Sequence, residues 1–361
     1  AGCEPAKGIK IFDSKCGGKV MKKLGLLLFV AALLVMSQSA FAGGQSEGGE
    51  GGEVEPITLK YAHVGVEGEV LTQFADELAK RVEEETEGRV VLEVYGNSAL
   101  GNIDEMINGV KNGTIDMAMH DFASLARFVP NLAVFNAPFI YKDAAHSMRV
   151  TDPYSSNVML QLNEELIDTA GIRIWGNCYR GARQLTANFP VYSPADVEGE
   201  KIRGVPLPIW MSMLEGMGAI PTPVEYSELA TALATGVVVG QENPLNNIYN
   251  GKLYEVQDYT MMTSHMQAIQ TQFINEESWQ SISADDRAIM ERIVVELGNE
   301  SVDWTLSARD GYRAKLEEAG MTFISQDDGL DIDAFQTAVL AQVEVDFPEW
   351  TGLIAEIKQI P

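Results

Sequence analysis

Hydrophobic positions in the first part of the fold alternate between two spacings. Short apolar runs typical of strands occupy Ile57–Ala62, Val90–Tyr95 and Ile115–Met119. Apolar residues recur at helical spacing from Leu71 to Val82, and Ile103–Lys111 shows the same periodicity. Because strands that alternate with helices are typical of parallel sheets, the pattern predicts a parallel sheet covered by helices.

A second set of strands and helices follows and predicts a second α/β lobe. The last predicted helix is long enough to run back across both lobes, and no internal repeat is present. The predicted strands are Ile172–Asn177, Lys201–Arg203, Val237–Val239 and Gln267–Ile274, and the predicted helices are Ile209–Met217, Glu228–Thr235 and Ala288–Lys315.

A different pattern near the start of the chain predicts export. A basic start at Met21 is followed by an apolar run of 13 residues, Leu24–Met36, and by a small-x-small cleavage pattern that ends at Ala42. The apolar run is too short to span a bilayer comfortably. We therefore interpret residues 21–42 as a signal peptide and expect a periplasmic or extracytoplasmic protein.

The residues that flank the signal peptide are expected to lie outside the fold. Residues 1–20 are interpreted as upstream or read-through sequence, and the Gly-, Glu- and Ser-rich residues 43–55 as a flexible linker. Cys3 and Cys16 fall in the upstream segment, so no intramolecular disulfide is expected. We expect the remaining Cys178 to be a small buried apolar residue rather than a reactive thiol.

The mature chain is strongly acidic. Removing residues 1–42 takes six lysines and two acids from 26 basic and 52 acidic residues, which leaves 20 against 50 and a formal charge of −30. Such a surface repels phosphate backbones and anionic membranes, which argues against a nucleic-acid-binding or lipid-binding protein. Because salt screens charges beyond about 8 Å, a cleft with two arginines can still attract an anion.

Few residues are arranged for catalysis or metal binding. The four histidines show no HExxH spacing and no CxxC pair is present, so we predict no catalytic residue, metal site or cofactor. His63 and the pair His120 and Asp121 each follow a predicted strand, and ligands in open α/β sheets lie at the carboxyl ends of strands. These three residues are candidates for the wall of a binding cleft, with purely structural histidines as the alternative.

Several motifs follow one another from Tyr179 onwards. They are GARQLTAN, ADVEGEKIR, PTPVEYSELATALATG and GQENPLNNIYNGKLYEV. On these motifs, and over essentially Ile57 to Glu356, the chain resembles the DctP-type substrate-binding proteins of tripartite ATP-independent periplasmic (TRAP) transporters. ADVEGEKIR stands in place of the family's usual DLKGLKIR. The resemblance is specific because QENP, an RQxT motif and a KIR strand occur together and in order.

The resemblance implies four ligand-binding residues. Arg203 matches the family's main carboxylate-binding arginine, and Arg183 matches its second arginine. Asn243 matches the asparagine of QENP, and Tyr226 matches the ring that packs beside the ligand. A guanidinium offers a planar fork that fits both oxygens of a carboxylate. Asn243 precedes a proline, which indicates a fixed turn. The alternative for Arg203 is a surface cation paired with Glu200.

Three positions differ from the family pattern or have more than one interpretation. Gly204–Pro208 contains a second proline where many relatives have a polar side chain, so one usual ligand contact is expected to be missing. Trp210 is either an apolar wall of the site or part of the core. Glu242, next to the QENP asparagine, either binds a hydroxyl or cation or has a structural role.

The resemblance also implies the fold and the partners. It implies an α/β two-lobe periplasmic-binding-protein fold, class II-like, with hinge strands and a long helix crossing both lobes. Lobe I is expected at 56–180 plus 269–308 and lobe II at 181–268 plus 309–361. Ligand binding closes such lobes, and the closed monomer is expected to dock on the small and large integral membrane subunits, which use an ion gradient. No ATP site is implied.

The chemistry of the ligand is predicted from the supply of hydroxyl-binding groups. We expect a monocarboxylate with several hydroxyls, such as a uronate or aldonate, ahead of a C4-dicarboxylate or another monocarboxylate. The groups that can bind hydroxyls outnumber the two arginines. They are Tyr226, Asn243, Glu242, His63 and Asp121.

Two other classes of protein stay open at this point. A secreted hydrolase or lyase needs a base and a nucleophile or metal in the cleft, and only His63, His120 and Asp121 are available for these roles. A periplasmic ligand-sensing protein has the same sequence features as a transport protein.

Overall fold

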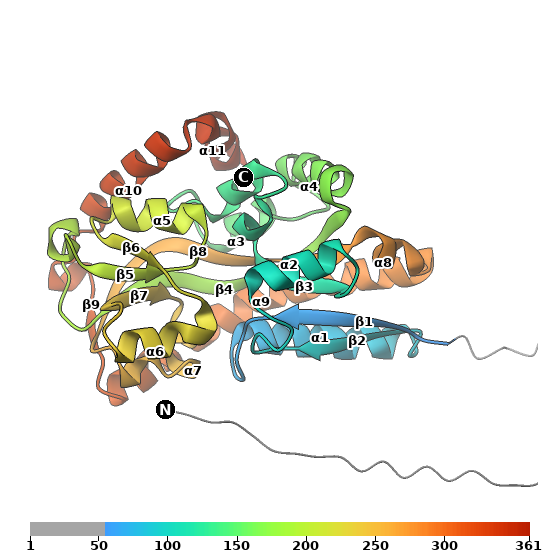
Figure 1. Cartoon of the computed structure of the whole chain (residues 1–361), viewed down its shortest axis with the longest axis horizontal. Helices are drawn as coiled ribbons and strands as arrows, with labels where there is room; N and C mark the ends of the chain where they lie inside the picture. The colour runs from blue at the N-terminus through green and yellow to red at the C-terminus, as the bar shows by residue number, and fades with distance from the viewer. Residues whose placement is uncertain (1–54) are drawn as a thin grey trace, which may run out of the picture. The chain divides into compact units, whose positions relative to one another are not determined.

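A mixed sheet of nine strands organises residues 55–361, the part of the chain that the computed structural model describes (Figure 1). The predicted upstream segment, the signal peptide and all but the last linker residue lie outside the described residues. The strands are β1 (Ile57–His63), β2 (Val90–Tyr95), β3 (Met117–Asp121), β4 (Ile172–Ala187), β5 (Lys201–Gly204), β6 (Ile220–Pro223), β7 (Gly240–Asn243), β8 (Tyr259–Asn275) and β9 (Thr322–Ile324). They lie in the order β2-β1-β3-β8-β4-β7-β5-β6, and β9 pairs with β8.

Helices cover the sheet. Within residues 55–361, none of them is long and apolar enough to cross a membrane. They are α1 (Val70–Glu85), α2 (Ile103–Lys111), α3 (Ala144–Val150), α4 (Asn157–Ala170), α5 (Pro208–Gly216), α6 (Leu229–Ala234), α7 (Leu245–Asn250), α8 (Glu276–Ser281), α9 (Ala284–Glu318), α10 (Ile332–Asp346) and α11 (Thr351–Gln359).

Helix capping explains where two of the predicted helices begin. The side chain of Asn102 accepts from the backbone N–H of Glu105 at 3.0 Å, and the Glu105 carboxylate accepts from the backbone N–H of Asn102 at 2.8 Å. This capping box starts α2 at the predicted residue. Helix α9 starts at Ala284, four residues before the prediction, because Ser283 caps the backbone N–H of Asp286 at 3.1 Å.

The strand predicted at Val237–Val239 is wrong, because these valines form the link between α6 and β7. The backbone N–H of Val237 donates to Ala232 at the end of α6 at 2.9 Å, so the chain is still closing the helix there. Strand β7 begins only at Gly240. Asn243 is therefore the last residue of a strand rather than part of a turn.

The two longest strands cross the whole sheet and run antiparallel to each other. β4 has 16 residues and β8 has 17, and β8 also runs antiparallel to β3, as β4 does to β7. The prediction of a parallel sheet holds among β1, β2 and β3 and among β5, β6 and β7, but it is wrong for β4 and β8. β4 carries the chain from the first parallel half of the sheet to the second, and β8 carries it back. The two strands therefore run in opposite directions.

The pairing of β4 with β8 is interrupted near its middle. Register shifts occur between Tyr179 and Gly181 and between Arg183 and Leu185. Gly181 has φ +115°, and a Cβ there would lie 3.2 Å from both Pro244 and Thr305. Only glycine fits this position without strain. The interruption bends the strand where the two halves of the sheet meet.

The fold is the expected two-lobe α/β architecture. Strands β1 to β3 form one half of the sheet and β5 to β7 the other, on either side of β8 and β4. Helix α9 packs on β4 and contacts α1 in the first half and α7 in the second, so it does cross both lobes (Figure 1).

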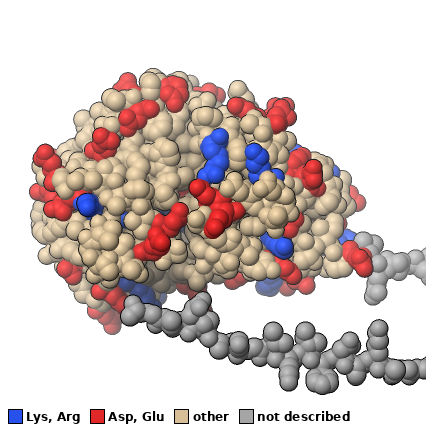
Figure 2. Space-filling model, in the orientation of Figure 1, with Lys and Arg blue, Asp and Glu red and all other residues tan. Residues whose placement is uncertain are grey.

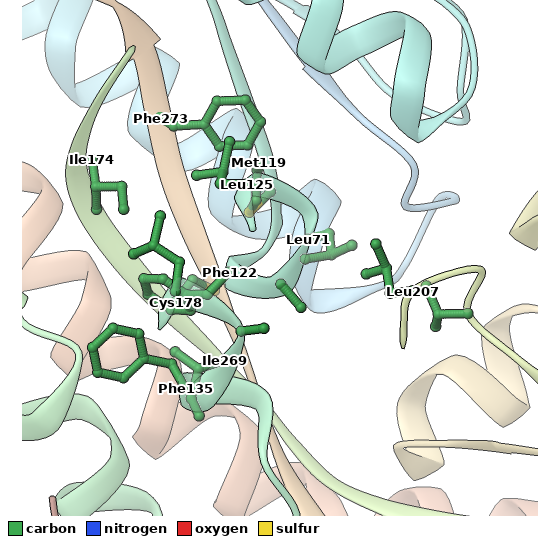
Figure 3. Close-up of a cluster of buried hydrophobic side chains, with 14 of the residues drawn as sticks. Leu71, Met119, Phe122, Leu125, Phe135, Ile174, Cys178, Leu207, Ile269 and Phe273 are labelled. Atoms are coloured by element: carbon green, nitrogen blue, oxygen red, sulfur yellow. The ribbon is translucent and has the colours of Figure 1, made fainter. Parts of the chain in front are cut away.

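The largest core cluster is built around the two long strands (Figure 3). Ile174 and Cys178 of β4 and Ile269 and Phe273 of β8 pack there with Phe122, which follows β3. Cys178 is completely buried, and burial raises the pKa of its thiol to about 12. The structural interpretation of Cys178 is confirmed.

Candidate ligand-binding site

Charged side chains from both halves of the sheet line a small cavity of about 20 Å³. The cavity lies at the carboxyl ends of β3, β5 and β7 and beside the middle of β4, next to the loop after β1. A cavity of this size does not hold a molecule of several carbon atoms unless the residues that line it move. Its polar lining consists of Glu69, His120, Asp121, Arg180, Arg183, Arg203, Tyr226 and Asn243.

Arg203 is the arginine of this cavity that is best placed to hold an anion. It lies on β5 with 2% of its surface exposed, so it is not a surface cation paired with Glu200. Its Nε donates to the carbonyl of Val224 at 2.8 Å, and within residues 55–361 its two terminal nitrogens have no hydrogen-bond partner and it forms no ion pair. Burial lowers the pKa of Arg203 to about 10. A buried cation without a partner favours binding of an anionic ligand.

Arg183 also lines the cavity, but a glutamate already occupies its fork. Its Nη2 donates to Glu242 Oε1 and to the Glu242 carbonyl, both at 2.7 Å, and its Nε donates to Oε2. Burial alone would raise the pKa of Glu242, but Arg183 and His265 together outweigh burial and lower the pKa to about 2. The two charges therefore neutralise each other inside the protein.

Two further side chains hold Glu242 in place. Trp210 Nε1 donates to Glu242 Oε1 at 3.1 Å, and the guanidinium of Arg183 lies 5.5 Å from the centre of the Trp210 ring. His265 Nε2 lies 3.1 Å from Glu242 Oε2, while its Nδ1 lies 2.7 Å from the Thr263 hydroxyl. Trp210 and His265 fix Glu242, and Glu242 in turn holds the guanidinium of Arg183 in position. Neither Trp210 nor Glu242 lines the cavity.

Arg180 was not predicted, although it lines the same cavity as Arg183. Its Nη2 donates to Asn243 Oδ1 at 3.3 Å, and its Nε is buried without a partner within residues 55–361. In a regular strand, residues three apart point to opposite faces. The irregularity at Gly181 brings both arginines to one cavity, and nothing in the strand pattern of the sequence indicates it.

Tyr226 and Asn243 take part in hydrogen bonds that also involve residues absent from the prediction. The Tyr226 hydroxyl donates to Oε1 of Glu69, a completely buried glutamate at the start of α1. Asn243 Nδ2 donates to Gln241 Oε1 at 2.6 Å. Glu69 lies in an EGE sequence that has the composition of an exposed loop, which explains why sequence reasoning missed it.

His120 and Asp121 line the cavity, whereas His63 does not. Asp121 accepts from Gln270 Nε2 at 2.7 Å, and His120 Nδ1 lies 3.6 Å from Asp121 Oδ2. His63 lies beneath the loop after β1, where its Nδ1 accepts from the backbone N–H of Gly65 at 3.1 Å. Burial lowers the pKa of both histidines to about 4.

The lowered histidine pKa values predict a pH-dependent stability. Unfolded histidines titrate near pH 6.5, so between about pH 6.5 and 4 these two histidines bind more protons in the unfolded chain than in the folded chain. The free energy of unfolding should fall as the pH decreases through this range, by about 1.4 kcal/mol per pH unit for a neutral buried histidine such as His63. Urea unfolding at pH 7.0 and 5.5 measures the fall, which should be about 1 kcal/mol smaller in His63→Asn. An equal fall in both proteins would contradict this assignment.

The site has the chemistry of anion capture. Within residues 55–361, no group of three or more His, Cys, Asp or Glu side chains is placed to hold a metal ion. The arginines of the cavity are buried, while acidic side chains are spread over the visible face of the molecule (Figure 2). Three buried arginines that line the cavity can therefore attract an anion there.

Comparisons with known proteins agree with this chemistry. The family model DctP, described as bacterial extracellular solute-binding protein, family 7, matches residues 61–346. A solute-binding protein of Roseobacter denitrificans is 32% identical over 323 residues, which cover 90% of this chain and 94% of that protein.

Two solved structures share the fold. One is a TRAP periplasmic solute-binding protein from Roseobacter denitrificans with bound L-galactonate, at a TM-score of 0.76 and 30% identity over 83% of this chain and 98% of that one. The other is a TRAP periplasmic solute-binding protein from Actinobacillus succinogenes, also with bound L-galactonate, at a TM-score of 0.78 and 25% identity over 84% and 98% of the two chains.

Proposed function

Because the chain belongs to the DctP family of bacterial extracellular solute-binding proteins, family 7, we propose that it captures a sugar acid outside the cytoplasm and delivers it to a TRAP transporter. The protein is a binding protein and not an enzyme. The observation that carries the proposal is Arg203, a buried guanidinium in the cavity between the two halves of the sheet, whose terminal nitrogens have no partner within residues 55–361.

The charge balance of the cavity favours a ligand with one carboxylate. Arg183 is neutralised by Glu242, and Arg180 lies close enough to Glu69 to lower the pKa of that carboxyl, against the larger effect of burial, which raises it. Arg203 is thus the cation best able to pair with a ligand. The L-galactonate bound by two relatives is a monocarboxylate with several hydroxyls, in agreement with this balance.

We infer that the two lobes close on the ligand about the middle of β4. The proposed boundaries are 56–180 plus 269–308 for lobe I and 181–268 plus 309–361 for lobe II. The register shift next to Gly181 falls at the first of these boundaries and supports a hinge there. Glu69 and Tyr226, which come from opposite halves of the sheet, hydrogen-bond across the cavity and support the same motion.

Delivery requires partners in the membrane. We propose that the closed protein docks as a monomer on the small and large integral membrane subunits of the transporter. The closed form differs from the open form in the relative position of the lobes, so a surface that spans both lobes distinguishes loaded from empty protein.

A panel of organic acids in a thermal-shift assay tests the ligand class. A ligand that binds only the folded state stabilises it by about 2.7 kcal/mol at a hundredfold excess over Kd, which raises Tm by several degrees. We expect aldonates and uronates to give the largest shifts, and malate and succinate to give smaller ones. The bound acid should be recovered unchanged. Tighter binding of a C4-dicarboxylate than of every sugar acid would reject the proposed class.

A further inference from the structure

Glu69 occupies an unusual position for a carboxylate. It precedes α1, none of its surface is exposed, and it lines the same cavity as Arg203. Within residues 55–361 it forms no ion pair within 4 Å, in contrast to Glu242. A buried carboxylate is rarely retained without a cation or a full set of hydrogen bonds.

The hydrogen bonds of Glu69 are incomplete. Oε1 accepts from the Tyr226 hydroxyl, but Oε2 is buried and has no partner within residues 55–361. Burial raises the pKa of Glu69, although Arg180, the side chains of Tyr226 and Asn247 and the backbone of Val66 oppose this. An ionised carboxylate accepts several hydrogen bonds, so Oε2 of this cavity-lining glutamate can still accept from a donor on a ligand.

The position of Glu69 in the sheet indicates which part of a ligand it meets. Glu69 follows β1 in one half of the sheet, whereas Arg203 lies on β5 in the other half. Both side chains line the cavity, with Arg180 of β4 between the two halves. A ligand that spans the cavity with its carboxylate on Arg203 can therefore reach Glu69 with its other end.

We propose that Glu69 is a specificity-determining residue that accepts a hydrogen bond from a hydroxyl at the end of the ligand distant from its carboxylate, and that its charge excludes a second carboxylate there. The inference rests on the proposed capture of a sugar acid and deepens it. A hydroxyl donates to Oε2 and completes the hydrogen bonds of Glu69. A carboxylate at the same place has no proton to donate at neutral pH and is repelled.

Three ligands that differ only at the distal carbon test this proposal. L-galactonate carries a terminal hydroxyl, L-fuconate is its 6-deoxy analogue, and galactarate has a carboxylate in place of the terminal CH₂OH. For another preferred aldonate, the matching deoxy acid and aldarate replace them. In the parent protein we expect L-fuconate to bind about 10- to 150-fold more weakly, the range for a hydrogen bond to a charged group, and galactarate at least about 100-fold more weakly.

Glu69→Gln removes the charge and keeps the shape. Isothermal titration of this variant should show the preference for L-galactonate over L-fuconate reduced to under about tenfold, because a neutral acceptor forms a weaker bond. Binding of galactarate should improve by at least about tenfold, because the repulsion is gone. The matched control is Glu67→Gln, an exposed glutamate in the same loop that does not line the cavity. It should leave all three affinities unchanged within about twofold.

The results separate this inference from the proposed function. If no sugar acid binds the parent protein, the proposed function fails. If sugar acids bind but galactarate binds as well as L-galactonate, or if the ligand ratios in Glu69→Gln equal those of the parent, only the role of Glu69 is rejected. Circular dichroism checks that Glu69→Gln folds; if it does not, equal binding of galactarate and L-galactonate by the parent protein still rejects the role of Glu69.

Discussion

Arg203→Ala is expected to weaken binding of the ligand by about two to four orders of magnitude. The terminal nitrogens of Arg203 have no partner within residues 55–361, so both oxygens of a ligand carboxylate can accept hydrogen bonds from its guanidinium. A hydrogen bond between charged groups contributes about 1.5 to 3 kcal/mol, and two of them are lost in the variant. Isothermal titration with the tightest sugar acid of the panel measures the loss.

Arg203→Lys separates a geometric anchor from a merely electrostatic one. Lysine keeps the charge but cannot form the planar fork, so we expect this variant to bind nearly as poorly as Arg203→Ala. Binding within about threefold of the parent protein, or under about 0.7 kcal/mol, would contradict the assignment. Arg180, whose Nε has no partner among the described residues, would then be a better candidate than Arg183, whose guanidinium is held by Glu242.

Glu242→Ala is expected to be the most destabilising of these substitutions, at about 3 to 5 kcal/mol of unfolding free energy. Glu242 and Arg183 are both essentially unexposed, and removal of the glutamate leaves the arginine charged and unpaired. Trp210 and His265 lose their hydrogen-bond acceptor as well. Equilibrium unfolding in urea at pH 7 measures the effect.

A surface pair provides the control for Glu242. Glu296 pairs with Arg292 on α9, and both side chains are 48% exposed. Glu296→Ala should change the stability little, because solvent and salt screen exposed ion pairs. If Glu242→Ala were no more destabilising than Glu296→Ala, the buried network would not be what holds Arg183 in position.

The sequence predicts well the elements whose signals are local. β2 and α2 have the predicted bounds, because a strand with a clear apolar run and a capping box specify their own ends. β4 is far longer than predicted, because the glycines at 176 and 181 and the polar residues around them interrupt the apolar pattern. β8 likewise begins eight residues before the prediction, where it buries Thr260, Thr263 and His265 in place of apolar side chains.

The sequence motifs likewise predict some residues of the site, whereas others depend on the surrounding three-dimensional structure. Arg203, Arg183, Asn243 and Tyr226 follow from the motifs, and all four line the cavity. The motifs do not indicate that Arg183 is paired, because this depends on a glutamate 59 residues away and on two further side chains that hold it. Glu69 and Arg180 depend on burial and on a strand irregularity, which a single sequence does not show.

A crystal structure of the protein grown with the tightest sugar acid of the panel tests the central claim most directly. We expect one ligand between the two halves of the sheet, with both oxygens of its carboxylate on the guanidinium of Arg203 and with Arg183 still paired to Glu242. A ligand bound elsewhere, or bound in this cavity with its carboxylate away from Arg203, would contradict the account.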